Sequence, residues 1–165
     1  GNTGPVFYFL HGGGYSGLTW ACLATELCSR IECRLLVPDL RGHGQTHTQD
    51  ESDLSTERQV KDIINIYNAV FGQNDEEEPP LVCVVGHSMG GALAVHVVAT
   101  NEIPNVVGLV VIDVVEGSAM DALSGMRYGT YRLCMLSLDV VQDETAAAST
   151  TLAMQSPLSA LNLEL

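Results

Sequence analysis

Short apolar runs alternate with longer stretches of helical periodicity along the 165-residue chain. Apolar runs of four to eight residues that are rich in β-branched side chains are typical of buried strands. They predict strands at residues 6–10, 34–37, 81–85 and 106–112. Strands that alternate with helices favour a mostly parallel sheet with helices on both faces, and the length suits one domain.

Helical spacing of apolar residues fills the intervals between these runs. A helix is predicted over 18–30, and these residues are available for its inner face: Leu18, Ala21, Leu23, Ala24 and Leu27. A second helix is predicted from its N-cap, Ser55, to its stop at Gly72. Its core-facing residues recur at helical spacing: Val60, Ile63, Ile64, Tyr67, Val70 and Phe71. A third helix is predicted over 92–99, where proline is absent.

The third apolar run ends in a glycine-rich turn, Gly86-His-Ser-Met-Gly90, which fits the G-x-S-x-G pattern of a nucleophile elbow. In this turn Ser88 would stand at a sharp bend between strand and helix, with its hydroxyl exposed above the sheet. Gly86 and Gly90 suit positions where a Cβ would collide with the backbone. The backbone N–H of Met89 would then point at the oxyanion of an acyl-transfer intermediate.

A second glycine run, His11-Gly-Gly-Gly14, follows the first strand. The α/β-hydrolases carry an HGGG-type loop in this position, where a backbone N–H completes the oxyanion hole. We expect Gly13 to supply this second donor, with Gly12 as the alternative. His11 is expected to bond the loop rather than to act as a base. Because an oxyanion hole needs donors from two segments, the loop and the elbow support each other.

The strand at 34–37 is followed by D-x-R-G-H-G, a turn that is frequent in α/β-hydrolases. We expect Asp39 and Arg41 to pair and to hold loops together near the site. His43 is interpreted as a structural residue of this turn, with a catalytic role as the less favoured alternative.

Serine alone is a poor nucleophile at neutral pH, so Ser88 needs a histidine base and an acid that orients this base. In this fold the acid follows the nucleophile and the histidine comes last. Asp113 has the right order and directly follows the strand at 106–112, at the sheet edge where active residues gather. A polar strand end that bonds a loop is an equally good interpretation of Asp113. Glu116 and Asp121 are weaker candidates.

The histidine of the triad has no candidate in the expected place. The chain has five histidines: His11, His43, His47, His87 and His96. The order of this fold requires the histidine to come after the acid, but none of the five follows Asp113. His87 directly precedes the nucleophile, so its side chain is expected to point away from that of Ser88. The chain therefore lacks the expected base, and losing this base can cost on the order of 10⁶ in kcat.

The net charge argues against two classes of partner, and the cysteine pattern argues against a metal site. Seven basic residues stand against 20 acidic ones, and the net charge of −13 disfavours binding to nucleic acid and to anionic membranes. The acidic run at 75–78 is interpreted as a solvated loop. The cysteines are odd in number and lack metal-ligand spacing: Cys22, Cys28, Cys33, Cys83 and Cys134. We therefore expect no metal and no other cofactor.

The sequence shows neither a signal peptide nor an apolar run long enough to span a bilayer. The default expectation is therefore a reducing, intracellular compartment, cytoplasmic or nuclear.

Four segments together resemble one family of α/β-hydrolases, the protein phosphatase methylesterases. They are the glycine loop 11–14, the turn 39–44, the elbow 86–91 and, most specifically, Val111-Ile-Asp-Val-Val-Glu-Gly-Ser-Ala-Met-Asp-Ala-Leu123. The resemblance implies a serine carboxylesterase that removes the methyl ester from the C-terminal leucine of the phosphatase 2A catalytic subunit. It also implies Ser88 as the nucleophile and Asp113, rather than Glu116 or Asp121, as the triad acid.

The resemblance runs from about Gly4 to Met126. We therefore expect residues 1–126 to form the N-terminal part of an α/β-hydrolase domain, with an incomplete sheet. Residues 127–165 show neither the family's pattern nor a clear strand pattern, so we expect a divergent tail. The chain is interpreted as a form of the hydrolase that is truncated at both ends.

Two other functions fit the same residues. A chain without the triad histidine would bind the phosphatase without turnover. A general α/β-hydrolase that acts on small esters or lipids would share the elbow and the glycine loop, and only the match at 111–123 argues against it.

Overall fold

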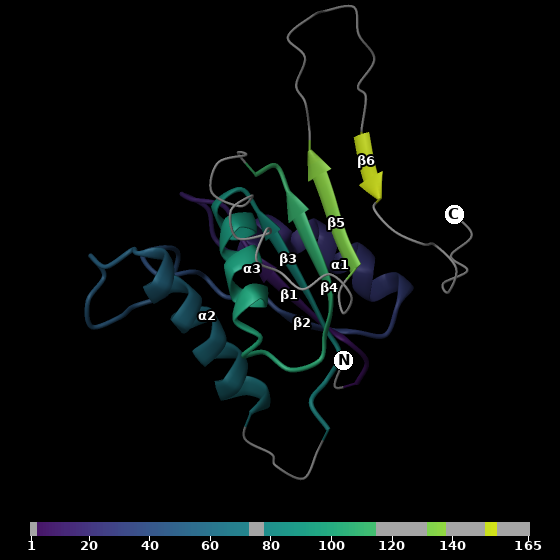
Figure 1. Ribbon diagram of the computed structural model, residues 1–165, viewed down its shortest axis with the longest axis horizontal. Coiled ribbons are helices and arrows are strands. Elements are labelled where there is room, and N and C mark those ends of the chain that lie inside the picture. Colours follow the sequence, from purple (N-terminus) through teal and green to yellow (C-terminus); the bar gives the residue numbers. More distant parts are fainter. Residues whose placement is uncertain (1–2, 73–77, 115–131, 138–150, 155–165) are drawn as a thin grey trace, which may run out of the picture.

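The computed structural model describes residues 3–72 and 78–114 and the backbone of two further strands (Figure 1). Its centre is a six-stranded sheet in the order β2-β1-β3-β4-β5-β6. The strands are β1 (Val6–Leu10), β2 (Arg34–Leu36), β3 (Val82–His87), β4 (Val106–Ile112), β5 (Arg132–Ser137) and β6 (Thr151–Met154). All neighbours in this order run parallel except β5 and β6, which are antiparallel. The mostly parallel sheet is therefore confirmed.

Four strands lie where the apolar runs predict them. β1 and β4 have the predicted bounds, and β2 is one residue shorter than predicted. β3 is shifted toward the elbow and includes His87, because this residue still pairs with Ile112 of β4. The elbow is thereby anchored to the strand that ends next to Asp113.

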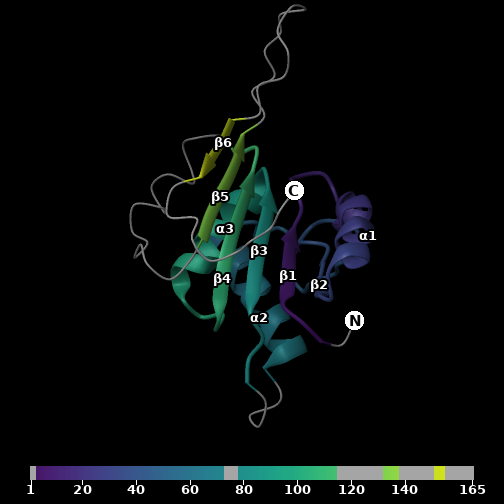
Figure 2. The same ribbon diagram turned by 90° about the vertical axis from the view of Figure 1, so that its right-hand side faces the viewer.

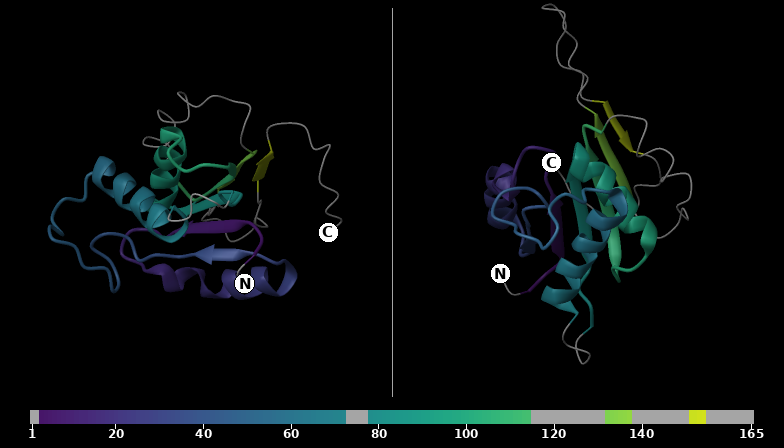
Figure 3. Two further views of the ribbon diagram at one scale, coloured as in Figure 1. Left: turned by 90° about the horizontal axis from the view of Figure 1, so that it is seen from below. Right: turned by 90° about the vertical axis from the view of Figure 1, so that its left-hand side faces the viewer.

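Helices cover both faces of the sheet (Figure 2, Figure 3). α1 (Ala21–Arg30) lies on one face, and α2 (Thr56–Phe71) and α3 (Met89–Thr100) lie on the other. α2 has its predicted start, where the Ser55 hydroxyl accepts a hydrogen bond from the N–H of Arg58. α3 begins earlier than predicted, directly after the elbow serine. None of the helices in the described ranges has the length and hydropathy needed to cross a membrane.

The main core lies between the sheet and the helices α2 and α3. The strands β1 and β3 contribute fully buried side chains: Val6, Tyr8, Leu10, Val82 and Val84. The hydroxyl of Tyr8 donates to the carbonyl of Ile63 at 2.8 Å and so ties β1 to α2. Within the predicted inner face of α2, Val60, Ile63, Ile64 and Tyr67 are buried, Phe71 is partly buried and Val70 is exposed.

The first predicted helix differs from its prediction. It starts with a 3₁₀ turn, Gly17–Trp20, which is followed by α1. A 3₁₀ helix has three residues per turn, so the side chains no longer fall at α-helical spacing. Leu18 in this turn is 82% exposed. In α1, Leu23 is 44% exposed and Ala21 is exposed as well, so the predicted inner face is wrong for these three residues. Trp20 is buried instead, with its ring centroid 5.0 Å from that of Phe9.

We expect Trp20→Ala to lower the free energy of unfolding by about 3–5 kcal/mol, because it removes a buried aromatic ring and leaves a cavity beside Phe9. Leu18→Ser changes an exposed position of the same turn and is expected to stay within about 0.5 kcal/mol of wild type. Urea unfolding followed by circular dichroism measures both values. Equal losses in the two variants would contradict this account of the turn.

The last two strands lie in the segment that the sequence analysis treats as a divergent tail. β5 pairs with β4, and β6 pairs with β5. β5 consists largely of leucine, cysteine and methionine without a β-branched residue, so its composition does not separate strand from helix. Three further expectations concern positions outside the described residues. They are the boundary after residue 126, the solvated loop at residues 75–77 of the acidic run, and the weaker acid candidates Glu116 and Asp121.

Candidate active site

The candidate nucleophile Ser88 stands at a strained turn between β3 and α3. Its φ is 51°, a value that residues other than glycine rarely adopt. A Cβ on Gly86 would collide with the carbonyl oxygen of Gly90. A Cβ on Gly90 would collide with the carbonyl oxygen of Leu10 on β1. Only glycine fits at these two positions, and the turn has the backbone geometry expected of a nucleophile elbow.

The start of α3 presents backbone donors next to Ser88. The first N–H groups of a helix have no intrahelical acceptor. The carbonyl of Ser88 accepts hydrogen bonds from the N–H of Gly91 at 2.9 Å and from the N–H of Ala92 at 3.1 Å. Met89 is the first residue of α3, so its N–H is one of the groups without an intrahelical acceptor. Helix N-termini favour anions, so the Met89 N–H is suited to an oxyanion.

The glycine loop lies beside this helix start, because β1 ends level with the first residue of the elbow. A Cβ placed on Gly13 would lie 3.7 Å from the Sδ of Met89, which makes the two residues neighbours. Gly13 is exposed, whereas Gly12 is buried. Exposure therefore favours Gly13 over Gly12 as the second donor, and the two-donor oxyanion hole remains a prediction.

Two imidazole rings hold the glycine loop in place. The Nε2 of His11 accepts from the N–H of Leu40 at 2.9 Å, and its Nδ1 donates to the carbonyl of Gly12 at 2.8 Å. The Nε2 of His43 accepts from the N–H of Gly14 at 3.0 Å, and its Nδ1 donates to a carbonyl of its own turn at 2.8 Å. Both nitrogens of each ring are therefore engaged, as the structural interpretation of His11 and His43 requires.

Burial lowers the pKa of His11 below its ordinary value of 6.5. The unfolded chain then binds more protons than the folded one in the window below pH 6.5. The stability that neutral His11 contributes is complete above this window and is lost as the pH falls through it.

We therefore expect the free energy of unfolding to decrease from about pH 7.5 to about pH 5.5, and His11→Gln to flatten this dependence. Urea unfolding at the two pH values measures the slope, with His47→Gln at an exposed histidine as the control. A slope that His11→Gln leaves unchanged would show that another group causes it.

The predicted pair of Asp39 and Arg41 is wrong. The carboxylate of Asp39 accepts from the backbone N–H of Gln45 at 2.8 Å and of Gly17 at 2.7 Å, and these bonds lower its pKa. The buried Arg41 instead binds Asp62 of α2, with 3.0 Å between Nη2 and Oδ1. The pair does not form because nearby backbone donors satisfy Asp39, and α2 supplies the carboxylate for Arg41.

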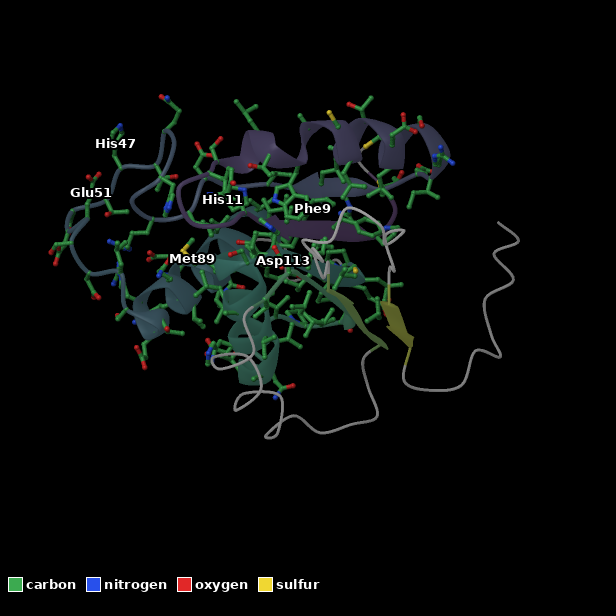
Figure 4. All side chains as sticks on the ribbon, turned by 90° about the horizontal axis from the view of Figure 1, so that it is seen from above. Phe9, His11, His47, Glu51, Met89 and Asp113 are labelled. Carbon is green, nitrogen blue, oxygen red and sulfur yellow. The ribbon has the colours of Figure 1, made fainter. Side chains whose placement is uncertain are left out.

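Asp113 directly follows the end of β4, on the sheet edge where the parallel strand β3 ends before Ser88. Figure 4 shows the side chains of Asp113 and of Met89, the residue after Ser88. The N–H of Ser88 donates to the carbonyl of Ile112 at 2.9 Å and ties the elbow to this strand end. Asp113 has a φ of 50°, and 59% of its side chain is exposed. The structure places Asp113 where the triad acid is expected, and its role in the triad remains a prediction.

His87 is a site residue that the sequence analysis does not assign. Its Nε2 lies 3.9 Å from the Oδ2 of Asp113. Its Nδ1 is buried and has no hydrogen-bond partner among the described residues. Strand pairing is the signal that could have found this contact, because His87 lies opposite Ile112, the neighbour of Asp113.

No hydrogen bond joins a histidine to the Ser88 hydroxyl in the part of the chain that the structure describes. His47 lies on an exposed loop, 3.4 Å from Glu51, and Figure 4 shows this pair well apart from Asp113. His96 belongs to α3. The described ranges also contain no group of three or more residues that could hold a metal ion. The general base is thus unassigned.

The sheet, the elbow and the glycine loop agree with a family model described as the alpha/beta hydrolase family, which matches residues 7–158. The chain belongs to this family, and the predicted fold class is confirmed.

Within the family, the chain is similar to the protein phosphatase methylesterases. It is 61% identical over 127 residues to the probable protein phosphatase methylesterase 1 of Caenorhabditis elegans, covering 76% of this chain and 34% of that protein. It is 50% identical over 127 residues to protein phosphatase methylesterase 1 of Mus musculus, covering 77% of this chain and 32% of that protein. The predicted resemblance is confirmed, and the chain spans about a third of the length of these relatives.

Solved structures show the same fold. A marine microorganism esterase has a TM-score of 0.55 at 32% identity, covering 68% of this chain and 39% of that protein. A thioesterase domain from the curacin biosynthetic pathway has a TM-score of 0.56 at 26% identity, covering 73% of this chain and 43% of that protein.

Proposed function

We propose that the chain carries the nucleophile and the oxyanion hole of a serine carboxylesterase. Ser88 attacks the ester carbonyl carbon, and the resulting oxyanion accepts hydrogen bonds from the N–H groups of Gly13 and Met89. A base, oriented by Asp113, takes the proton of Ser88 and gives it to the departing alkoxide, which leaves as an alcohol. Water then attacks the acyl-enzyme in the same way and releases the acid. These steps need no cofactor.

One observation carries this proposal. The strained turn at Ser88, the start of α3 at Met89 and the exposed Gly13 meet at one end of the sheet, although β1 and β3 are far apart in the sequence. This arrangement supports the proposal, because acyl transfer requires a serine hydroxyl beside two backbone donors, and the half-buried Ser88 lies next to both segments.

We further propose that the substrate is the methyl ester of the C-terminal leucine of the phosphatase 2A catalytic subunit. The names of the relatives, at 61% and 50% identity, support this choice. The alcohol released is then methanol, and the phosphatase subunit is the protein partner. The net charge of −13 disfavours nucleic acid as a partner.

A leucine-terminated peptide methyl ester tests the substrate. Because the base is unassigned, imidazole is added as an external base. We expect methanol release that rises with imidazole concentration and is absent in Ser88→Ala, with the free peptide acid measured by mass spectrometry. Hydrolysis of p-nitrophenyl acetate without any peptide demethylation would instead favour a general esterase of small substrates.

Binding without turnover is the second candidate function. It is favoured by the observation that none of the described histidines is hydrogen-bonded to Ser88. A pull-down with the purified methylated catalytic subunit tests it, with the unmethylated subunit as the matched control. Retention of the methylated form, with no methanol release at any imidazole concentration, would favour this candidate over the esterase.

We also propose an intracellular location, cytoplasmic or nuclear. The thiols of Cys22, Cys28 and Cys33 are free, as is usual in a reducing compartment. Cell fractionation that recovers the protein only from the medium would contradict this location.

A further inference from the structure

His87 lies against both of the other segments of the candidate active site. Its Nε2 is 3.9 Å from the Oδ2 of Asp113 at the end of β4. On the opposite side, a Cβ placed on Gly12 would lie 2.9 Å from its Nδ1, and the ring of Tyr15 meets the imidazole edge-on at a centroid distance of 6.2 Å. The ring is therefore held between the glycine loop and the acid.

The backbone fixes this arrangement. His87 lies opposite Ile112 in the β3–β4 register, and the next N–H, that of Ser88, donates to the carbonyl of Ile112 at 2.9 Å. Directly beyond this pair both strands leave the sheet with a positive φ, 51° at Ser88 and 50° at Asp113. Strand pairing thus fixes the backbone positions of His87 and Asp113 relative to each other.

The surroundings of the imidazole also determine where its proton sits. Nδ1 is buried without a partner among the described residues, so a proton there would be an unsatisfied buried donor, which is costly. A carboxylate only accepts, so the proton belongs on Nε2, facing the Oδ2 of Asp113. The described residues give the other oxygen, Oδ1, no partner, and it stays available to the general base.

We propose that His87 is a positioning residue of the esterase: its Nε2–H holds the Oδ2 of Asp113, so that Oδ1 faces the base that activates Ser88. The proposal deepens the proposed function and rests on it. At 3.9 Å the contact is longer than a hydrogen bond, and catalytic contacts of this kind commonly tighten when substrate binds. Because the same ring packs against Gly12, it also couples the acid to the oxyanion loop.

Nuclear magnetic resonance of the ¹⁵N-labelled chain tests the contact without requiring activity. We expect the ring nitrogens of His87 to show the Nε2–H tautomer and to shift in Asp113→Ala. They should not shift in Glu102→Ala, which removes an exposed carboxylate elsewhere. His96 provides an internal reference. Unchanged His87 signals in a folded Asp113→Ala chain would overturn the proposal.

Fluorophosphonate labelling in the presence of imidazole tests the role. We expect His87→Leu to slow labelling about tenfold, the effect of losing one hydrogen bond to a charged group. His87→Gln keeps an N–H donor and is expected to recover most of the rate. Equal rates in wild type and a folded His87→Leu would overturn the positioning role.

The two proposals fail in different ways. If the folded wild-type chain is not labelled at any imidazole concentration, the esterase proposal fails. The resonance experiment then still decides whether His87 and Asp113 are paired. If His87→Leu does not fold, His87→Gln and Asp113→Ala carry the test.

Discussion

Ser88→Ala is expected to abolish labelling of the chain by a fluorophosphonate probe, a loss of at least about a hundredfold. The probe reacts with a serine whose hydroxyl can reach its phosphorus atom, and backbone donors stabilise the negative charge that develops on the phosphoryl oxygen of the probe. Other serines differ: the hydroxyls of Ser52 and Ser55 are bound to Asp50 and Asp53 at 2.6 and 2.7 Å. In-gel fluorescence measures the labelling, and peptide mass spectrometry identifies the modified residue.

Ser29→Ala is the matched control, because Ser29 is an exposed serine on α1 that bonds only its own helix. Its labelling is expected to equal that of wild type. Labelling that persists in Ser88→Ala would refute the nucleophile. Rapid labelling of wild type without imidazole would show that the chain supplies a base of its own, against the expectation from the sequence.

Gly90→Ala is expected to lower the free energy of unfolding by more than about 4 kcal/mol, or to prevent folding. The added methyl group would collide with the carbonyl oxygens of Leu10 and His11. These atoms belong to the backbone of β1 and of the loop after it, so they cannot move away without breaking the pairing of β1 with β3. Urea unfolding followed by circular dichroism measures the loss.

Gly13→Ala provides the comparison for this substitution. A Cβ on Gly13 would meet only the side chain of Met89, at 3.7 Å and 4.0 Å, which is ordinary contact. We expect its stability to stay within about 1 kcal/mol of wild type. Equal stability of the two variants would show that the elbow tolerates a side chain at Gly90, against the packing described above.

The elements that were predictable from the sequence are those whose signal is local. β1 and β4 follow from unbroken apolar runs, and α2 follows from its N-cap and the periodicity of its buried residues. The start of α1 was not predictable, because an α-helical and a 3₁₀ turn differ little in composition. There the burial of Trp20 against Phe9 decides the geometry and leaves Leu18 exposed.

The same distinction applies to the site. The geometry around Ser88 follows from a five-residue pattern whose glycines are required by contacts within the turn and with β1. The partners of Asp39 and Arg41 come from other segments, and sequence spacing does not encode them. The contact of His87 with Asp113 depends on the register of two strands, which only pairing in three dimensions fixes.

The pairing of β1 with β3 also has a consequence for folding during synthesis. Leu10 lies opposite Gly86, so a further 76 residues must be synthesised before the edge of β1 that faces β3 can pair. Closing so long a segment costs conformational entropy, which makes the contact slow to form. A unit of β1, α1 and β2 can assemble first, with the other edge of β1 still open to aggregation. The proposed acyl-transfer geometry is therefore acquired only after α3 has left the ribosome, and a chaperone that shields β1 would act before this geometry forms.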